Sequence, residues 1–336
     1  MATISDVAKL AGVSKTTVSR FLNQKSDGNM TPETERKIVE AVEYFKYKPS
    51  SIARSLKVKE TRAIGLIIHD ISNPFFQPLV SGVEDALYKS GYSLILCNTN
   101  LDLNEELVCL DTLEQRQVDG ILLAGLDIPV EHLKNFKADI PIVLLERQVD
   151  EDICDVISVD NFKGAYIGVE HLIQLGHRKI AHVTGNENTR VAKERAEAFH
   201  QCMQDYGVKL ETGYIMKGNY KLESGYEAMK GLMALETRPT AVFFANDLMA
   251  VGGIRFLLEK NIRIPDEMSI VGFDDIMISS VITPPLTTIK QPIYEMGKRA
   301  TDILLGRINQ KSGGPKENII LEPSLIVRSS TQKLDE

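Results

Sequence analysis

From residue 62 onward, apolar runs of strand length alternate with amphipathic stretches of helical length. Apolar strands separated by helices are typical of parallel sheets that are covered by helices on both faces. The runs form two series, each with its own helices, so the pattern predicts an α/β fold with two doubly wound lobes. The expected strands are Ala63–Ile68, Ser93–Asn98, Gly120–Ala124 and Ile142–Leu145 in the first series, and Lys179–Thr184, Ala241–Ala245 and Ser269–Gly272 in the second.

The boundary between the two series lies near residues 160–164. The final segment, from residue 291 to about 323, is expected to return to the first lobe. We therefore predict a first lobe made of residues 62–160 and 291–323, and a second lobe made of residues 163–289. A chain of 336 residues is long enough for such a multidomain arrangement with sizeable cores.

The first sixty residues have a different pattern, with apolar positions at helical spacing in three short segments. Thr3 and Asp6 fit the start of a capping box, Gly12 can close the first helix in the left-handed conformation, and Ser14 can cap the second. A third helix is expected to begin at Thr31-Pro32-Glu33. The residues expected to form the shared core are Val7, Ala8, Leu10, Ala11, Val18, Phe21, Leu22, Ile38, Ala41, Val42 and Phe45.

The turn at Gly12-Val13-Ser14 is so short that the first two helices must cross steeply. A helix-turn-helix places the start of its second helix against base edges in the major groove, and Lys15, Thr16 and Arg20 can donate hydrogen bonds there. An αα-hairpin corner with a polar face is the alternative interpretation. The charge distribution favours DNA binding, because residues 1–60 carry 11 Lys and Arg against 7 Asp and Glu, whereas the rest of the chain carries 28 against 39.

A short segment separates this head from the lobes. Pro49 ends the preceding structure, and Ser50 or Ser51 can cap a new turn. Residues Ile52–Leu56 make barely more than one helical turn, which is too little to be stable alone in water. We expect the segment to be helical only when it is held, and a solvated linker is the alternative. The predicted boundaries are residues 1–48 for the head and 49–61 for the hinge segment.

The stretch TISDVAKLAGVSKTTVSRFLN resembles the DNA-binding head of the lactose/galactose repressor family, and the match continues without a gap through residue 61. The resemblance implies that two hinge helices meet in the minor groove, where Leu56 wedges between base pairs and Arg54 lies near phosphate. The residues implied to contact DNA are Thr3, Ser14, Lys15, Thr16, Thr17, Ser19, Arg20, Asn23, Ser50, Ala53, Arg54 and Leu56.

Polar and aromatic side chains are expected at the ends of several predicted strands. In open parallel sheets ligands bind outside the carboxyl ends of the strands, and two facing lobes form a cleft from those ends. Aromatic faces combined with paired donors and acceptors suit a sugar ring. Taken singly, the aromatics can be core residues, Asp274 a helix cap and Arg195 a surface ion pair. The candidate effector-binding residues are Asn73, Phe75, Phe76, Glu146, Arg147, Arg195, Tyr220, Asn246, Asp274 and Gln291.

The body of the chain resembles the core of the same repressor family and the periplasmic sugar-binding proteins, especially the ribose-binding type. This resemblance implies a periplasmic-binding-protein-like fold of type I. Glu146 stands where the ribose-binding type has aspartate and Tyr220 where it has phenylalanine, so the pocket differs in shape. The added phenol can hydrogen-bond a further hydroxyl or carboxylate. The matching positions are Asn73, Phe75 and Phe76 in NPFF, Arg147, Arg195, Asn246 in AND, Asp274 in GFD, and Gln291 at the last crossover.

The sequence motifs do not favour catalysis or metal binding. The side chains of adjacent acids such as Asp274 and Asp275 usually point apart, and no nucleophile motif or glycine-rich phosphate loop accompanies them. His171 and His177 are six residues apart, which is not a metal-ligand spacing on one helical face. We therefore expect no enzyme activity, no metal and no cofactor.

The combined resemblance implies a sequence-specific transcriptional repressor of a carbohydrate-utilisation operon. A homodimer is expected to place two heads on a near-palindromic operator, and a sugar-like effector between the lobes is expected to change operator affinity. One alternative is a catabolite-control regulator driven by a phosphorylated carrier protein, although Asp302 is aligned with the arginine that such regulators use. Another alternative is a sugar-binding module without a DNA function.

Targeting signals are missing from the pattern. The N-terminus lacks a basic segment followed by an apolar one, and no apolar run reaches about 18 residues. The four cysteines lack CxxC spacing, which favours reduced thiols. We expect a cytoplasmic protein without a membrane partner. The SSTQKLDE stretch has no sustained heptads, so dimers are expected rather than tetramers.

Overall fold

The computed structural model describes residues 2–22, 30–47, 60–100, 102–124, 140–146, 153–310 and 314–334. The chain divides into two compact units, Met1–Thr61 and Arg62–Glu336. Several residues singled out by the sequence lie outside the described ranges, so their predicted contacts stay predictions. They are Asn23, Ser50, Ala53, Arg54, Leu56 and Arg147.

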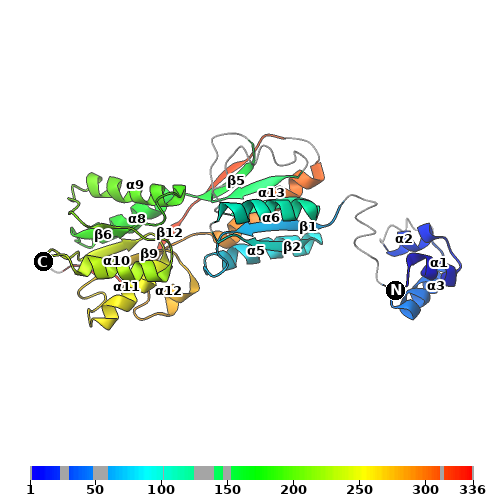
Figure 1. Cartoon of the computed structure of the whole chain (residues 1–336), viewed down its shortest axis with the longest axis horizontal. Coiled ribbons are helices and arrows are strands. Elements are labelled where there is room, and N and C mark those ends of the chain that lie inside the picture. The colour runs from blue at the N-terminus through cyan, green and yellow to red at the C-terminus, as the bar shows by residue number, and fades with distance from the viewer. Residues whose placement is uncertain are drawn as a thin grey trace. The chain divides into compact units, whose positions relative to one another are not determined.

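The described part of the first unit contains helices α1 (Ile4–Ala11), α2 (Lys15–Leu22) and α3 (Pro32–Phe45) (Figure 1). The Asp6 carboxylate accepts hydrogen bonds from the backbone N and the hydroxyl of Thr3, both at 2.8 Å, which confirms the capping box. Gly12 ends α1 with φ 65°, in the left-handed region that favours glycine. Ser14 Oγ accepts from Thr17 N at 3.0 Å and so begins α2 as expected.

The three helices share a small core. Val7, Val18 and Ile38 are fully buried, one from each helix. The prediction for Leu10 was wrong, since its side chain is 53% exposed. At 100° per residue, Leu10 lies roughly a third of a turn away from the centre of the face formed by Val7, Ala8 and Ala11. Its apolar character therefore does not place it in the core.

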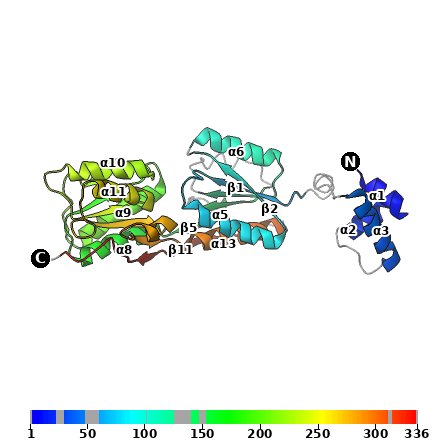
Figure 2. The same cartoon turned by 90° about the horizontal axis from the view of Figure 1, so that it is seen from below.

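The second unit begins with a six-stranded sheet in the order β11-β5-β4-β3-β1-β2. All its neighbouring strands are parallel. Helices α5 (Phe76–Ser90) and α13 (Ile293–Gln310) cover one face, and α6 (Leu103–Gln115) covers the other (Figure 2). The strands are β1 (Ala63–Ile68), β2 (Ser93–Asn98), β3 (Gly120–Ala124), β4 (Ile142–Leu145), β5 (Asp155–Val159) and β11 (Asn318–Leu321).

A second six-stranded sheet follows the order β12-β10-β9-β8-β6-β7, and its pairs are parallel except for β10 with β12. Helices α8 (Asn161–Gln174) and α9 (Arg190–Asp205) pack on one face, and α10 (Leu222–Met233) and α11 (Asp247–Glu259) pack on the other. The short helix α12 (Met277–Val281) follows β9. The strands are β6 (Ile180–Val183), β7 (Ile215–Met216), β8 (Ala241–Phe244), β9 (Ser269–Asp274), β10 (Thr287–Lys290) and β12 (Ser324–Ile326).

The chain crosses between the two sheets at three places. It leaves the first sheet after β5, returns after β10 through Gln291 and Pro292, and leaves again between β11 and β12. The ion pair of Lys163 Nζ with Glu322 Oε2, at 2.7 Å, joins the first and last of these crossings. The α/β class with two parallel-dominated sheets is confirmed. Among the described residues, no helix combines the length and apolar character needed to span a membrane.

Candidate functional site

A cavity of about 450 Å³ lies among the strand ends of the two sheets, a size within the usual range for small-molecule sites. The loop before α5 and the ends of β3 and β4 supply one side of it. Helix α9, the loops after β6, β7 and β8, and the end of β9 supply the other. Eight of the ten candidate effector residues line it together. They are Asn73, Phe75, Phe76, Glu146, Arg195, Tyr220, Asn246 and Asp274.

The NPFF stretch builds an aromatic wall at the start of α5. Asn73 Oδ1 accepts a hydrogen bond from Phe75 N at 3.1 Å, which folds the loop into the helix. The ring of Phe76 is buried and meets the rings of Phe75 and His69 edge to face, with centroid distances of 5.1 and 4.7 Å. Each such pair contributes about 0.5 to 1.5 kcal/mol beyond the burial of its area, which favours this arrangement of the rings in the wall.

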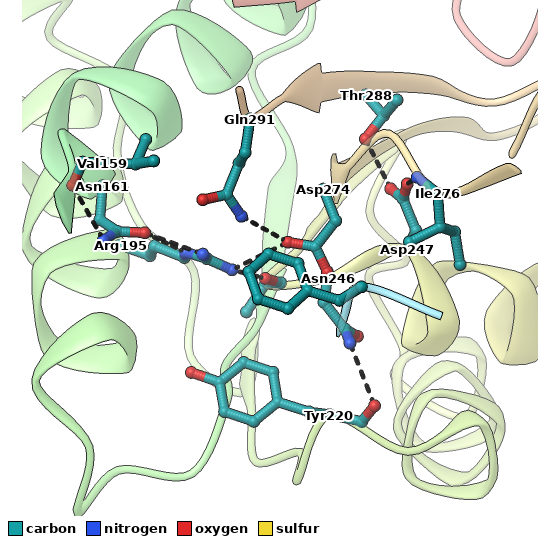
Figure 3. A network of polar contacts seen from close by, with 12 residues as sticks. Val159, Asn161, Arg195, Tyr220, Asn246, Asp247, Asp274, Ile276, Thr288 and Gln291 are labelled. Carbon is teal, nitrogen blue, oxygen red and sulfur yellow. Dashed lines mark hydrogen bonds and ion pairs between the residues drawn. The ribbon is translucent and has the colours of Figure 1, made fainter. Parts of the chain in front are cut away.

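Arg195 lies in the second turn of α9, so the expectation that it follows a strand was wrong. Its guanidinium is buried, and Nε and Nη2 donate to Asn161 Oδ1 at 3.0 and 2.8 Å (Figure 3). Nη1 donates to the carbonyl of Ala245, and the guanidinium carbon lies 3.6 Å from the centroid of the Phe273 ring. These contacts fix the plane of the guanidinium in the cavity wall.

Asp274 lies opposite that guanidinium, with Oδ1 3.8 Å from Arg195 Nη1. Gln291 Nε2 donates to the same oxygen at 2.7 Å. Gln291 itself is buried and is not among the lining residues, and only its amide nitrogen bonds to Asp274, so its contact with the effector stays a prediction. Burial raises the pKa of Asp274 well above its ordinary value, and the positive charge of Arg195 opposes this rise.

Asn246 and Tyr220 form a second linked pair. Asn246 caps α11 by accepting from Met249 N at 3.0 Å, and its Nδ2 donates to the backbone carbonyl of Tyr220 at 3.0 Å (Figure 3). The Tyr220 hydroxyl lies 3.4 Å from the hydroxyl of Thr189, which caps α9. Asn246 therefore positions the loop that carries Tyr220, and Tyr220 closes the cavity beside the start of α9.

The backbone at three cavity residues adopts a conformation that non-glycine residues rarely take. The φ angles are 57° at Glu146, 66° at Tyr220 and 122° at Asp274. Each such residue costs about 1 to 3 kcal/mol and persists only where its surroundings hold it. Their concentration around one cavity is typical of a functional site.

The Glu146 carboxylate turns toward the end of β5. Oε1 accepts from Val159 N at 3.0 Å and Oε2 accepts from Asn161 Nδ2 at 3.4 Å. Desolvation raises the pKa of Glu146 to about 7, against the opposing effects of Arg195 and Asn161. Asp247, next to the cavity, is fully buried and accepts from Ile276 N, Ser279 and Thr288.

These raised pKa values predict that the protein loses stability as pH rises through 7. A carboxyl with a pKa near 7 in the folded state and about 4.5 in the unfolded state stabilises the fold below about pH 4.5, and this stability is lost as pH rises through 7. Between pH 6.5 and 8 we expect Glu146 alone to lower the free energy of unfolding by about 1 kcal/mol. Urea titrations of the wild type and Glu146→Gln across this range test it, and equal slopes would contradict it.

The buried His182 also contributes to the pH dependence of stability. Burial lowers the pKa of His182 to about 4, so its contribution to stability is lost as pH falls below about 6.5. Near pH 6.5 the unfolded state is still partly protonated at this histidine, which opposes the carboxyl effect there. Because His182 is present in both proteins, the difference between the slopes of the wild type and Glu146→Gln reports the carboxyl alone.

Several residues of the cavity were not predicted from the sequence. Some stand in the loop after β6 and the first turn of α9, where polar residues look like an ordinary surface loop and helix start. The Asn-rich stretch GNENT before α9 is the signal that could have found them. The missed lining residues are His69, Leu79, Ala124, Leu145, Asn186, Asn188, Thr189, Arg190, Val191, Lys193 and Met296.

The head presents a separate polar surface at the start of α2. Lys15, Thr16 and Arg20 are exposed, and Thr17 is half-buried beneath them, with its hydroxyl 2.9 Å from that of Ser14. The exposed side chains carry donors suited to base edges and phosphates. Among the described residues, no group of three or more His, Cys, Asp or Glu side chains is arranged to hold a metal ion.

The model of the lacI family of bacterial regulatory proteins matches residues 3–50, and that of the periplasmic binding protein-like domain matches residues 169–331. The HTH-type transcriptional repressor PurR of Pasteurella multocida (strain Pm70) is 39% identical over 337 residues, which cover 99% of each chain. The chain belongs to the lacI family of bacterial regulatory proteins. The resemblance expected from the sequence is therefore confirmed.

Two solved structures of lacI-family proteins share this fold. The Lac repressor dimer bound to operator and the anti-inducer ONPF has a TM-score of 0.88 and 27% identity, covering 98% of this chain and 99% of that one. A LacI family transcriptional regulator from Enterococcus faecium with bound ribose has a TM-score of 0.75 and 32% identity, covering 81% of this chain and all of that one. The lacI-family chain described here is accordingly a helix-turn-helix transcriptional repressor.

Proposed function

We propose that this repressor controls a carbohydrate-utilisation operon and that a small sugar in the cavity changes its affinity for the operator. The observation that carries the proposal is the cavity itself. It sets aromatic rings from Phe75, Phe76 and Tyr220 around buried donors and acceptors from Arg195 and Asp274. Ring carbons of a sugar pack on aromatic faces while its hydroxyls are satisfied from the edges. The ribose bound to the Enterococcus faecium regulator supports this choice of ligand class.

The DNA-binding half of the proposal rests on the head. Lys15, Thr16 and Arg20 are proposed to contact base edges or phosphates in the major groove, with Thr3, Ser14, Thr17 and Ser19 supporting the surface. A single head makes few contacts, so a homodimer is proposed to occupy a near-palindromic operator. The Lac repressor bound to its operator as a dimer supports this assembly. The hinge residues Ala53, Arg54 and Leu56 keep their proposed minor-groove role.

The proposed domains keep the boundaries expected from the sequence, with the head at residues 1–48, the hinge at 49–61, and lobes at 62–160 with 291–323 and at 163–289. The effector is proposed to favour one arrangement of the two lobes and to release the operator. A coupling free energy of about 1 to 3 kcal/mol would weaken operator binding roughly 5- to 150-fold. The protein is proposed to act in the cytoplasm without catalytic activity.

The proposal is tested by calorimetric titration of the full-length protein with pentoses, hexoses, their phosphates and sugar acids. Any sugar that binds is then added to an operator-binding assay. We expect a free sugar to bind and to weaken operator affinity. Tight operator binding with no response to any member of the panel would contradict the proposed effector class. The exposed acidic Asp302 on α13 opposes a phosphorylated carrier protein at that place, so such a partner is not proposed.

The proposed effector site also predicts the effect of a methyl group at Gly185. A Cβ there would lie 2.1 Å from Cζ and 2.2 Å from the hydroxyl of Tyr220, so Gly185→Ala must displace the Tyr220 ring. We expect the sugar that binds in the panel to bind roughly 3- to 10-fold more weakly, the loss typical of one aromatic contact.

The matched control for this variant is Gly306→Ala on α13, because nothing lies within 4 Å of a Cβ at that position. Melting temperatures of both variants establish that they fold. An affinity in Gly185→Ala equal to that of the control would show that Tyr220 does not contact the effector.

A further inference from the structure

Asn161 uses every polar atom of its side chain in the centre of the site. It is the first residue of α8 and is 3% exposed. Its Oδ1 accepts from Arg195 Nε and Nη2 at 3.0 and 2.8 Å (Figure 3). Its Nδ2 donates to the carbonyl of Val159 at 3.2 Å and to Glu146 Oε2 at 3.4 Å.

The contact with Arg195 sets the direction of the guanidinium. The single oxygen of Asn161 receives two of its nitrogens, and the carbonyl of Ala245 receives the third. A planar guanidinium held on two sides keeps its remaining donors pointing in one direction. Without Asn161, two of the three nitrogens would lose their acceptor and the plane could rotate about the Phe273 ring.

The contact with Glu146 joins two parts of the fold. Glu146 follows β4 of the first sheet, and its other oxygen accepts from Val159 N at the end of β5. Asn161 begins α8, which packs with α9 against the second sheet. The donor of Asn161 therefore contacts the first sheet, while its acceptor holds an arginine of the second.

Asn161 is not needed to start its helix. The cap of α8 is Asp160, whose Oδ1 accepts from Lys163 N at 2.8 Å. The Asn161 side chain does not cap the helix, yet all its polar atoms form hydrogen bonds, including those to the two candidate ligand-binding residues. This arrangement indicates another role for Asn161.

We propose that Asn161 is a positioning residue of the effector site, which orients Arg195 toward the ligand and ties it to Glu146 at the strand ends of the first lobe. This inference rests on the proposed function of the cavity. It predicts that the acceptor oxygen of residue 161 determines effector affinity and that its donor determines the ionisation of Glu146.

Two variants at this position separate the acceptor from the donor. Asn161→Asp keeps an oxygen for Arg195 but loses the donor to Glu146, whereas Asn161→Leu loses both. With D-ribose as the probe and calorimetry on the full-length protein, we expect Asn161→Leu to bind about tenfold more weakly or worse, and Asn161→Asp to stay within about threefold of the wild type. The matched control is Asn104→Leu, on the exposed start of α6.

A second measurement needs no ligand. The groups that act on the Glu146 carboxyl are Asn161, Val159 N, Arg195, Glu194, Asp274 and Tyr220. Carbon-13 NMR of the glutamate carboxyls should show a higher Glu146 pKa in Asn161→Leu than in the wild type, and a higher one still in Asn161→Asp, because a negative charge replaces the donor. Asn104→Leu should leave it unchanged.

The outcomes distinguish the two proposals. If the wild type binds ribose and Asn161→Leu binds it equally well, the positioning role is wrong while the proposed function stands. If the wild type does not bind ribose, the proposed effector fails for this sugar, and the Glu146 titration decides whether Asn161 ties the site together. An unchanged Glu146 pKa in both variants overturns the inference in either case.

Discussion

Replacing Arg195 with methionine is expected to weaken effector binding by roughly 10- to 150-fold. A hydrogen bond that involves a charged group contributes about 1.5 to 3 kcal/mol, and every 1.4 kcal/mol is about tenfold in affinity. Arg195 is 3% exposed, and its positive charge offsets the burial of Glu146 and Asp274. Calorimetric titration with the sugar identified in the panel measures the loss.

The carboxyls of Glu146 and Asp274, which remain in the variant, add to this loss of affinity. Without the guanidinium, burial raises the pKa of Glu146 and Asp274 further, and both carboxyls take up protons near neutral pH. The control is Arg255→Met on α11, an exposed arginine paired with Glu259 at 2.9 Å, which should bind effector like the wild type. A loss below threefold in Arg195→Met would show that Arg195 does not face the ligand.

Replacing Arg307 with methionine is expected to destabilise the protein by about 3 to 5 kcal/mol, the usual loss when a buried ion pair is broken on one side. Asp155 begins β5 and its side chain is 1% exposed. Arg307 Nε and Nη2 donate to its two oxygens at 3.0 and 2.7 Å. Lys316 Nζ is farther away at 3.8 Å, so the methionine variant leaves a poorly compensated buried carboxylate. Urea or thermal unfolding of the full chain measures the difference.

The control for this prediction is Arg299→Met, on the same helix α13. Arg299 lies on the same helix, is half-exposed and pairs with Glu295 at 2.7 Å, and such a surface pair contributes about 0 to 1 kcal/mol. The double variant Asp155→Asn with Arg307→Met should recover most of the stability, since it removes the buried charge and keeps an acceptor for Glu317 N, which now donates to Asp155 at 2.9 Å. Equal losses for Arg299→Met and Arg307→Met would contradict the argument.

The apolar strands were predictable because hydrophobicity alone specifies them. Strands β1 to β4 begin and end where the sequence pattern placed them. Strand β6 is shorter than predicted by one residue at each end, and β8 and β9 differ by one and two residues at their carboxyl ends. Strands with buried polar residues were missed. Strand β5 begins with Asp155, and β10 begins with Thr287 and Thr288, whose hydroxyls lie near Thr331 and Asp247. Partners so distant in sequence cannot be read from a local pattern.

The edge strands were missed for a different reason. Strand β7 has only two residues, and β11 and β12 lie at the edges of their sheets, where all their residues except Leu321 are exposed or partly buried. Short strands with one open side carry little hydrophobic signal.

The candidate site was predicted in part, since the resemblance of motifs identified residues that the cavity brings together. The motifs did not identify Asn161, because an asparagine next to a helix cap is usually interpreted as a capping residue. The motifs also did not predict that Gln291 donates a hydrogen bond to Asp274. Both outcomes depend on side-chain hydrogen bonds across more than fifteen residues of sequence, which no spacing rule predicts.

The repeated crossing of the chain between its two sheets bears on how the protein is made. Strand β5 ends at residue 159, but its neighbour β11 begins only at residue 318. At about 5 to 20 residues per second, a ribosome takes roughly 10 to 30 seconds to synthesise the intervening segment. During this time the second sheet emerges, and the first sheet lacks its edge strand β11. The sheet face that α13 later covers is also exposed. A nascent chain in this state exposes a strand edge and apolar surface, both of which promote aggregation, so its yield in cells should depend on translation speed between these two strands.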